Sequence, residues 1–459
     1  MVKRSLAELA LMKALSTGGD FAELFFEDRV NNTVVLRGGK VEDINSGRQH
    51  GAGVRLFKGL RSVYAYTNDF EEAGLLECAS RAASALEYAP QIREITLTGS
   101  IAANIHPIRR LPGDVKNAWR TERLRSGHAA MSAVSAEIKQ TTLRYADSDQ
   151  RVTIANSDGL FVSDRRVYSR VACSAVASNG TESQTGFNGP GAMRGAEFAD
   201  NLDIDGISRD AAETAVKMLH ARVCPAGQMP VIIDKAFGGV VFHEACGHSL
   251  EASFIGRELS EFCGKLGQRI ATDKVTAIDD GTIPGEWGSL NIDDEGTPTT
   301  RLTLIENGIL KNYMVDKFNA RRINMPITGS GRREGYMYAP TSRMRNTFIA
   351  PGEDDPDEII SSMDDGLYAK KMGGGSVNPT TGEFNFAVDE GYLVRGGKIA
   401  EPVRGASLIG RGSEILMKID RVGREMAMGQ GMCGSFSGSV PTNVGQPMIR
   451  ISSMTVGGR

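Results

Sequence analysis

Two histidines five residues apart, with a glutamate directly after the first, place the tightest local constraint on this chain. They lie in the segment 243–248 (HEACGH), which follows an apolar run. On a regular α-helix, at about 100° per residue, side chains five apart point about 140° away from each other, so they cannot meet at one atom. A turn widened to i→i+5 hydrogen bonding reduces that angle to about 50°, and such turns are frequent at functional sites. The spacing therefore predicts a locally distorted helix.

The residue types in this segment indicate a hydrolytic metal centre. Imidazole is the commonest protein ligand for zinc, and a neighbouring carboxylate can accept a proton from a water molecule that the ion polarises. His243 and His248 are therefore candidate ligands and Glu244 is the candidate general base. Gly247 would supply backbone freedom for the distorted turn. The alternative is an incidental pair, because two nearby histidines often have no joint role.

A catalytic zinc site that keeps one position open for water needs a third protein ligand. Cys433 is the best candidate, because it lies between glycines in the segment 431–435 (GMCGS). A glycine-flanked loop can bring a thiolate close to an ion. Taken alone, a single cysteine is more often a small buried apolar residue. Both interpretations remain open on these residues alone.

Several ordered motifs together resemble the TldD branch of the TldD/PmbA family. They are the HExxxH pattern at 243–248, the segments 329–334 (GSGRRE), 431–434 (GMCG) and 444–447 (VGQP), and the ending 454–458 (MTVGG). The resemblance runs over most of residues 230–459 and is weaker before them. The partner branch, PmbA or TldE, lacks the HExxxH pattern, so this chain resembles the catalytic branch.

The resemblance implies a metalloprotease in which His243, His248 and Cys433 bind zinc and Glu244 acts as the base. It also implies substrates that are unfolded or flexible peptides, cleaved in a chamber that a dimer encloses. A homodimer and a heterodimer with a TldE/PmbA-like subunit that lacks the motif both remain open, as does iron in place of zinc. An older label that links the family to DNA gyrase predicts salt-dependent DNA binding instead.

Other polar residues near these motifs have two interpretations each. Arg332 or Arg333 is a candidate for polarising a peptide carbonyl or its developing oxyanion, and the alternative is a structural ion pair beside a hairpin. Cys246 is expected to pack in the interior. Glu251 is expected to hydrogen-bond an imidazole or to lie on a solvated helix surface. If Cys246 or Glu251 filled a fourth position, the metal would be structural and the chain a non-catalytic regulatory or binding subunit.

Composition argues against other classes of function. The chain has 459 residues, 41% of them hydrophobic, and a net charge of −3, so no basic excess supports nucleic-acid binding as the main activity. Its six cysteines show no paired spacing, which fits reduced thiols in the cytosol. The N-terminus has the pattern of an amphipathic helix rather than of a signal peptide, and no apolar run has the length of a membrane span. We therefore expect a soluble, cytoplasmic protein.

The chain is expected to form two domains of an α+β protein. Residues 1–227 should form an N-terminal α/β-type domain, with a small antiparallel sheet over 21–67 and helices at about 69–87, 114–138 and 209–222. Residues 228–459 should form a β-rich catalytic domain that contains the HExxxH helix. Turn signals at 156–159, 307–308 and 396–397 predict hairpins. The segment 383–388 is either an internal strand or an edge that pairs with an extended peptide.

Overall fold

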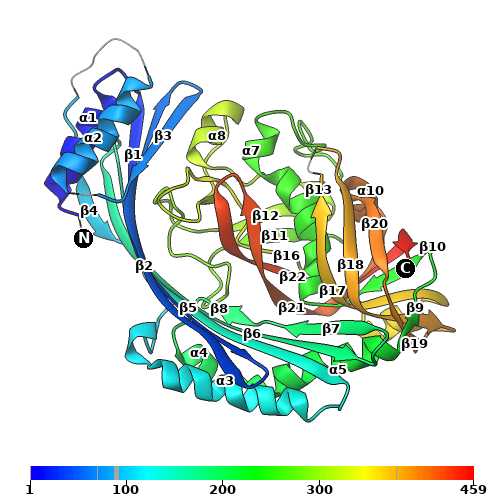
Figure 1. Cartoon of the computed structure of the whole chain (residues 1–459). Helices are drawn as coiled ribbons and strands as arrows, with labels where there is room; N and C mark the ends of the chain where they lie inside the picture. The colour runs from blue at the N-terminus through cyan, green and yellow to red at the C-terminus, as the bar shows by residue number, and fades with distance from the viewer. Residues whose placement is uncertain (1, 70, 87–92, 379, 459) are drawn as a thin grey trace.

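The computed structural model describes residues 2–69, 71–86, 93–378 and 380–458. The chain forms two large sheets, the first from strands within residues 21–192 and the second from strands within 222–457 (Figure 1). The α+β class predicted from the sequence is confirmed.

The first sheet consists mainly of two very long hairpins. Its strand order is β3-β2-β1-β5-β6-β4, with β7 and β8 also paired to β6. The four central strands each run for 17 to 19 residues. The strands are β1 (Phe21–Arg37), β2 (Lys40–Lys58), β3 (Arg61–Thr67), β4 (Thr98–Ile101), β5 (Ile138–Asn156), β6 (Leu160–Ser178), β7 (Ser183–Asn188) and β8 (Gly191–Ala192).

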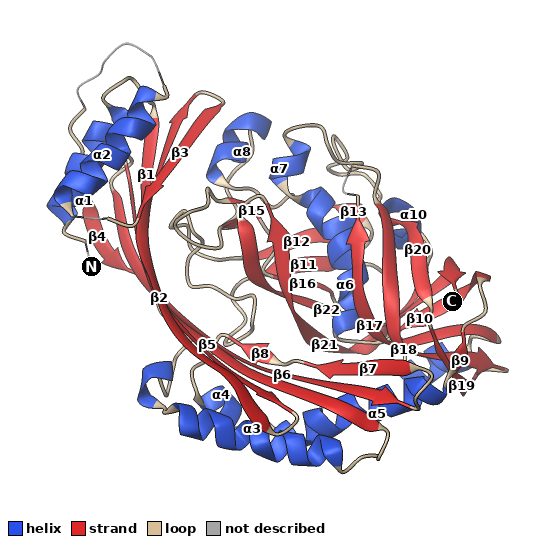
Figure 2. Ribbon diagram, in the orientation of Figure 1, coloured by secondary structure: helices blue, strands red, loops and turns tan. Residues whose placement is uncertain are grey.

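Helices cover this sheet at its two ends (Figure 2). A pair of helices packs on one end through a core of buried alanine and leucine side chains, and a second group packs on the other end through a separate core. The first pair is α1 (Arg4–Leu15) and α2 (Glu72–Ser84); the second group is η1 (Pro112–Asp114), α3 (Asn117–Ser132), α4 (Glu197–Asp200) and α5 (Ile204–His220).

The second sheet has twelve strands in the order β13-β12-β11-β16-β22-β10-β17-β18-β19-β9, with β20 and β21 paired beside this path. Because β9 pairs with β19, the second sheet begins at residue 222. The domain boundary predicted between residues 227 and 228 stays a prediction. The strands are β9 (Arg222–Val223), β10 (Gly227–Ile233), β11 (Ala277–Asp280), β12 (Arg301–Glu306), β13 (Ile309–Leu310), β16 (Asn346–Ile349), β17 (Asp365–Val377), β18 (Glu383–Arg395), β19 (Lys398–Arg404), β20 (Ser407–Arg411), β21 (Ile419–Ser435) and β22 (Gly438–Gly457). A separate short pair is β14 (Gly331–Arg332) with β15 (Thr341–Ser342).

The helices of the second half are short. Those within residues 237–255 follow one another closely and pack into the largest core. This segment carries the HExxxH pattern. The helices are η2 (Phe237–Gly239), α6 (Val240–Phe242), η3 (His243–Gly247), η4 (His248–Leu250), α7 (Ala252–Ile255), α8 (Lys317–Ile323), α9 (Pro356–Ser361) and α10 (Gly412–Leu416).

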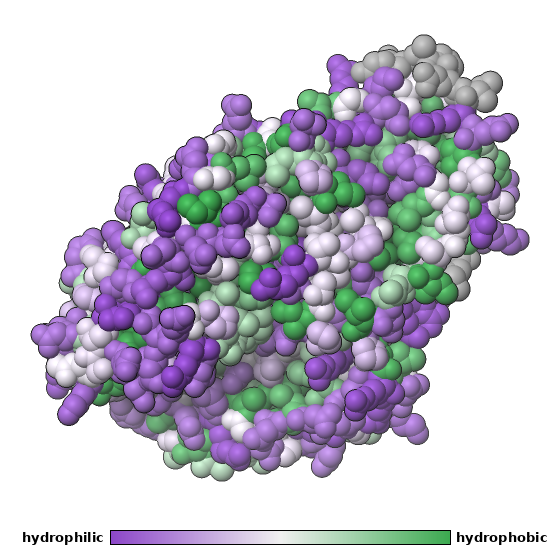
Figure 3. All heavy atoms as spheres, turned by 180° about the vertical axis from the view of Figure 1, so that it is seen from behind, coloured by the Kyte–Doolittle hydropathy of each residue, from purple (hydrophilic) through white to green (hydrophobic). Residues whose placement is uncertain are grey.

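Hydrophilic residues dominate the surface seen from behind, and apolar residues lie between them in small groups (Figure 3). Within the part of the chain that the structure describes, no helix combines the length and the apolar character that crossing a membrane requires.

The predicted helices and hairpins are present, with shifts at their ends. The helix predicted at 69–87 is α2, and residue 87 lies outside the described residues. The helix predicted at 114–138 ends at Ser132, because β5 begins at Ile138. The third helix begins at Ile204 rather than at 209, since the Asp203 carboxylate caps it by accepting a hydrogen bond from the Gly206 N–H at 2.8 Å. Hairpins join β5 to β6, β12 to β13 and β18 to β19, as the turn signals predict.

The segment 383–388 is an internal strand. It begins β18, which pairs with β17 along one edge and with β20 along the other. Both rows of backbone hydrogen-bonding groups are therefore occupied within the chain. The hypothesis that this segment pairs with an extended peptide is wrong.

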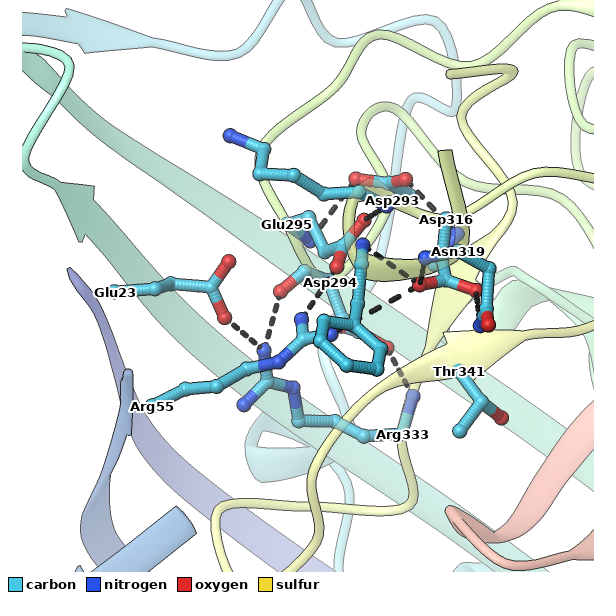
Figure 4. A network of polar contacts seen from close by, with 12 residues as sticks. Glu23, Arg55, Asp293, Asp294, Glu295, Asp316, Asn319, Arg333 and Thr341 are labelled. Carbon is cyan, nitrogen blue, oxygen red and sulfur yellow. Dashed lines mark hydrogen bonds and ion pairs between the residues drawn. The ribbon is translucent and has the colours of Figure 1, made fainter. Parts of the chain in front are cut away.

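A buried ionic network joins the two halves of the chain (Figure 4). Glu23 of β1 accepts a hydrogen bond from Arg333 at 2.6 Å, and Arg55 of β2 donates to Glu295 at 2.5 Å. All four side chains are at most 3% exposed. A buried charge is costly unless a partner compensates it, so these pairs fix the first sheet against the loops that carry Glu295 and Arg333.

Glu23→Gln is expected to lower the free energy of unfolding by about 3–5 kcal/mol, because it leaves the Arg333 guanidinium buried without its carboxylate partner. Urea titration followed by circular dichroism measures the change. Asp365→Asn is the control, since its ion pair with Arg395 is exposed on both sides and should matter little. Equal losses in the two variants would contradict a special role for the buried pair.

Candidate metal centre

The HExxxH segment forms a single π turn. Helix α6 passes into η3, and the N–H of His248 donates to the carbonyl oxygen of His243, which is an i→i+5 hydrogen bond. The two imidazoles lie on the same side of the turn, with ring centroids 5.1 Å apart and ring planes 83° apart. The distortion predicted from the five-residue spacing is therefore present, and it brings two buried histidines together.

Gly247 supplies space to this turn rather than backbone freedom. Its φ of −55° and ψ of −51° are ordinary right-handed helical values that any residue can adopt, so the turn does not use the backbone freedom expected of this glycine. A Cβ atom at this position would lie 2.2 Å from Sδ of Met344. The glycine is needed because Met344 packs directly against the turn.

Cys433 lies close to both histidines although it is far away in the sequence. It is in β21, three residues from the hairpin tip, and pairs with Val440 of β22. Its Sγ lies 3.2 Å from Nε2 of His243 and 3.3 Å from Nε2 of His248. Among the described residues, these three form the one group of His, Cys, Asp or Glu side chains close enough together to hold an ion.

The geometry of these donors fits a zinc ion. With zinc–nitrogen bonds of about 2.0–2.1 Å and zinc–sulfur bonds of about 2.3 Å, neighbouring donors of a tetrahedral site lie about 3.5 Å apart. The observed distances of 3.2 and 3.3 Å are close to this value. The Glu244 carboxylate lies 3.7 Å from Nε2 of His248 and is 26% exposed, so it stands beside the three donors and is accessible to solvent.

The charges of the centre favour a thiolate. Burial opposes ionisation of Cys433, but the imidazoles of His248 and His243 outweigh it and hold the thiol pKa well below its usual range. Burial likewise opposes protonation of His248, but the Cys433 thiolate and Glu251 raise its pKa well above the ordinary value. A cation that binds here therefore finds a ready thiolate and displaces a proton from His248.

Glu251 orients one of the two imidazoles. Its side chain is fully buried, and Oε1 lies 3.1 Å from Nδ1 of His248. The hydrogen bond leaves Nε2 free to face Cys433, which is how a carboxylate fixes the tautomer of a metal-binding histidine. The prediction of a hydrogen bond to an imidazole is confirmed, and that of a solvated helix surface is wrong.

Cys246 packs in the interior, as expected. It is 1% exposed, does not belong to the group of three donors, and lies against Gly412 of α10. Burial raises the pKa of its thiol well above the usual value. It therefore has the character of an apolar core residue.

The two candidate arginines have different surroundings. Arg333 is held by Glu23 at 2.6 Å, with its guanidinium 4.2 Å from the ring centroid of Phe25. Arg332 has no carboxylate within salt-bridge distance among the described residues, and it donates to the carbonyl oxygen of Met344 at 2.6 Å. Both arginines line a small cavity next to Met432. The alternative interpretation, a structural ion pair, describes the contacts of Arg333.

Arg343 is a residue of the site that sequence reasoning missed. It is fully buried and donates to Ser437 Oγ at 2.9 Å, to the carbonyl oxygen of Gly438 at 2.8 Å and to the carbonyl oxygen of Cys433. Its Nε lies 4.0 Å from Oε1 of Glu251. One guanidinium therefore bridges the strand of Cys433 and the carboxylate that orients His248. No local signal in the sequence distinguishes it from an exposed arginine.

Three family models together cover most of the chain. The PmbA/TldA metallopeptidase domain 1 matches residues 22–86, the central domain matches 110–219, and the C-terminal domain matches 226–458. The chain belongs to this family. The resemblance to the TldD/PmbA family noted in the motifs is thereby confirmed.

Curated relatives are named as metalloproteases. A metalloprotease TldD homolog from Haemophilus influenzae is 35% identical over 453 residues, which cover 96% of this chain and 93% of that protein. A metalloprotease TldD homolog from Buchnera aphidicola subsp. Acyrthosiphon pisum is 33% identical over 463 residues, which cover 98% and 95%.

Solved structures share the fold over the whole chain. A protein from Thermotoga maritima, described as a candidate modulator of a DNA gyrase, superposes with a TM-score of 0.80 at 21% identity and covers 99% of each chain. TldE from Thermococcus kodakarensis superposes with a TM-score of 0.77 at 18% identity and covers 99% of this chain and 100% of its own. At these identities the likeness shows the fold alone.

Arg343→Met is expected to weaken metal binding by about tenfold to a hundredfold, because Cys433 and Glu251 lose the group that bridges them. In the cobalt-loaded protein, the thiolate-to-cobalt absorption band should weaken with it. Arg345→Met is the matched control, since Arg345 is equally buried but pairs with Asp279. Arg345→Met should lower the free energy of unfolding and leave the thiolate-to-cobalt band unchanged. A band that Arg343→Met leaves unchanged would contradict the positioning role.

Proposed function

We propose that this chain is a zinc-dependent peptidase that cleaves unfolded or flexible peptides. The observation that carries the proposal is the convergence of three buried donors, His243, His248 and Cys433, on one point beside a solvent-accessible carboxylate. Two nitrogens and one sulfur are a donor set typical of zinc, and three protein ligands leave a position for water. The family models and the names of the relatives agree with this chemistry.

When bound, zinc supplies Lewis-acid chemistry that polarises a peptide carbonyl and makes a water molecule more acidic. Glu244 accepts the proton of the attacking water and then transfers it to the departing amine. Glu251 keeps Nε2 of His248 facing Cys433, where His243, His248 and Cys433 would hold the ion. Arg332 is the better of the two arginines for polarising the substrate carbonyl, because no carboxylate already neutralises it.

The alternative, a non-catalytic subunit with a structural metal, needs a fourth protein ligand. Neither Cys246 nor Glu251 joins the group of three donors, and the Glu251 oxygen faces Nδ1 of His248 rather than the point where the donors meet. A closed four-ligand site therefore lacks a candidate among the described residues. The lack of a fourth ligand favours an enzyme over a non-catalytic subunit.

We further propose a cytoplasmic dimer that encloses the site and admits only extended chains. Both a homodimer and a heterodimer with a TldE/PmbA-like subunit are compatible with the shared fold of TldE. The net charge of −3 gives no support to DNA binding as the main activity.

Glu244→Ala should retain zinc and lose cleavage of a flexible peptide by about a hundredfold or more, because the base is lost while the three donors remain. His243→Ala should lose both. Metal analysis beside a peptide-cleavage assay measures the two effects. Cleavage that Glu244→Ala leaves unchanged would rule out this residue as the base.

A further inference from the structure

The first sheet has one face covered by helices and one face that opens toward the second half of the chain. Side chains alternate between faces along a strand, and one set on β5 and β6 is buried against α3 and α5. Figure 2 shows these helices on one side of the strands and the second half of the chain on the other. The positions on the open face are Arg144, Ala146, Ser148, Tyr168, Arg170 and Ala172.

A cavity of about 640 Å³ lies over this open face. Trp287 and Met432 also line it, and Met432 directly precedes Cys433. Trp287 links the cavity to the strand of the metal centre, because its Nε1 donates to the carbonyl oxygen of Gly431 at 2.8 Å. The cavity therefore lies beside the strand that carries Cys433, on the face opposite the Cys433 side chain, and is built from residues that do not hold the metal.

Arg170 carries a charge that no carboxylate neutralises. Within the described ranges, it donates only to carbonyl oxygens, that of Gly189 at 3.1 Å and that of Gln430 at 3.5 Å. Burial, and then the neighbouring charge of Arg144, lower the pKa of Arg170. Two cations thus face one cavity, and a partly buried cation without an anion is unfavourable.

Among the described residues, no carboxylate that lines the cavity is free to neutralise these two arginines. Arg144 contacts Thr33 Oγ1 at 3.5 Å and has no carboxylate partner among the residues described. Asp147 also lines the cavity, but Arg120 engages it at 2.6 Å. The open face therefore has an excess of positive charge.

Apolar surface surrounds these charges. The Arg170 guanidinium carbon lies 5.6 Å from the ring centroid of Trp287. Phe187 and Met432, which also line the cavity, are 49% and 50% exposed. Such a combination of half-exposed apolar side chains with a few charged groups is typical of a binding site.

We propose that this cavity is a substrate subsite in which Arg170, assisted by Arg144, binds a carboxylate of an extended peptide. The inference rests on the proposed peptidase function and deepens it, because it names acidic peptides as the preferred class. Arginine presents a planar fork of donors that matches a carboxylate, and the bound anion would neutralise the excess charge. The carboxylate can belong to an aspartate or glutamate side chain or to the peptide C-terminus.

The geometry also gives the position of this carboxylate along the substrate. Arg170 contacts the carbonyl oxygen of Gln430, which precedes Cys433 by three residues in β21. At about 3.3 Å per residue, the guanidinium lies about 10 Å from Cys433 along the strand. A substrate that lies extended along β21 has the same rise, so on this proposal the recognised carboxylate lies about three residues from the cleaved bond.

The test uses the zinc-loaded full chain and flexible peptides that carry one Glu, or Gln in its place, at successive positions. The value of kcat/KM is expected to be about tenfold higher with Glu at one position about three residues from the cleaved bond, mainly through KM. Arg170→Gln should abolish this difference, so that the Glu and Gln peptides are cleaved with the same kcat/KM. Each peptide is tested as a free acid and as a C-terminal amide, which distinguishes a side-chain carboxylate from a terminal one.

Arg165→Gln is the matched control. It removes the same charge from the same strand, but Arg165 pairs with Asp149 at 2.6 Å and does not line the cavity. It should leave the preference intact. A preference that survives Arg170→Gln, or the absence of any carboxylate preference in the unsubstituted chain, would overturn the subsite.

Failure of the peptidase function would be visible separately. Glu244→Ala loaded with zinc is expected to bind labelled peptides without cleaving them, and fluorescence anisotropy with the same peptides measures the carboxylate preference directly. An anisotropy difference that depends on Arg170 supports the subsite even when no peptide is cleaved. Equal binding of the Glu and Gln peptides overturns it.

Discussion

The i→i+5 turn between His243 and His248 is the constraint on which the rest of the site depends. A regular helix would leave these side chains about 140° apart, whereas the π turn directs both to one side. Packing holds the turn, because Met344 fills the space beside Gly247 and Glu251 fixes one ring through Nδ1. A side chain at position 247 would therefore disturb the arrangement of His243 and His248 through its contact with Met344.

The third donor depends on contacts between distant parts of the chain. Arg343 holds the hairpin that carries Cys433, and the Glu334 carboxylate accepts a hydrogen bond from the N–H of Ser439 at 2.8 Å in the same hairpin. The residue before Glu334 is Arg333, which pairs with Glu23 of the first sheet. One short segment thus connects the first sheet to the hairpin that carries Cys433. This segment therefore couples the stability of the interface between the two halves to the geometry of the site.

Features that depend on nearby residues could be predicted from the sequence, and features that depend on tertiary contacts could not. The π turn follows from a spacing of five, and the β12–β13 hairpin follows from the turn at 307–308. The pairing of β18 on both edges depends on β20, and no local sequence pattern predicts that these two strands pair. Arg343 and Arg345 are fully buried, although arginines are mostly exposed in folded proteins. The uncompensated charge of Arg170 likewise appears only when its neighbours are known.

X-ray absorption at the zinc edge of the metal-loaded chain tests the central claim most directly. We predict a first shell with two imidazole nitrogens, one sulfur and one exchangeable oxygen, and we predict that Cys433→Ser removes the sulfur. A first shell without sulfur in the unsubstituted protein, or a sulfur signal that survives Cys433→Ser, would contradict this claim.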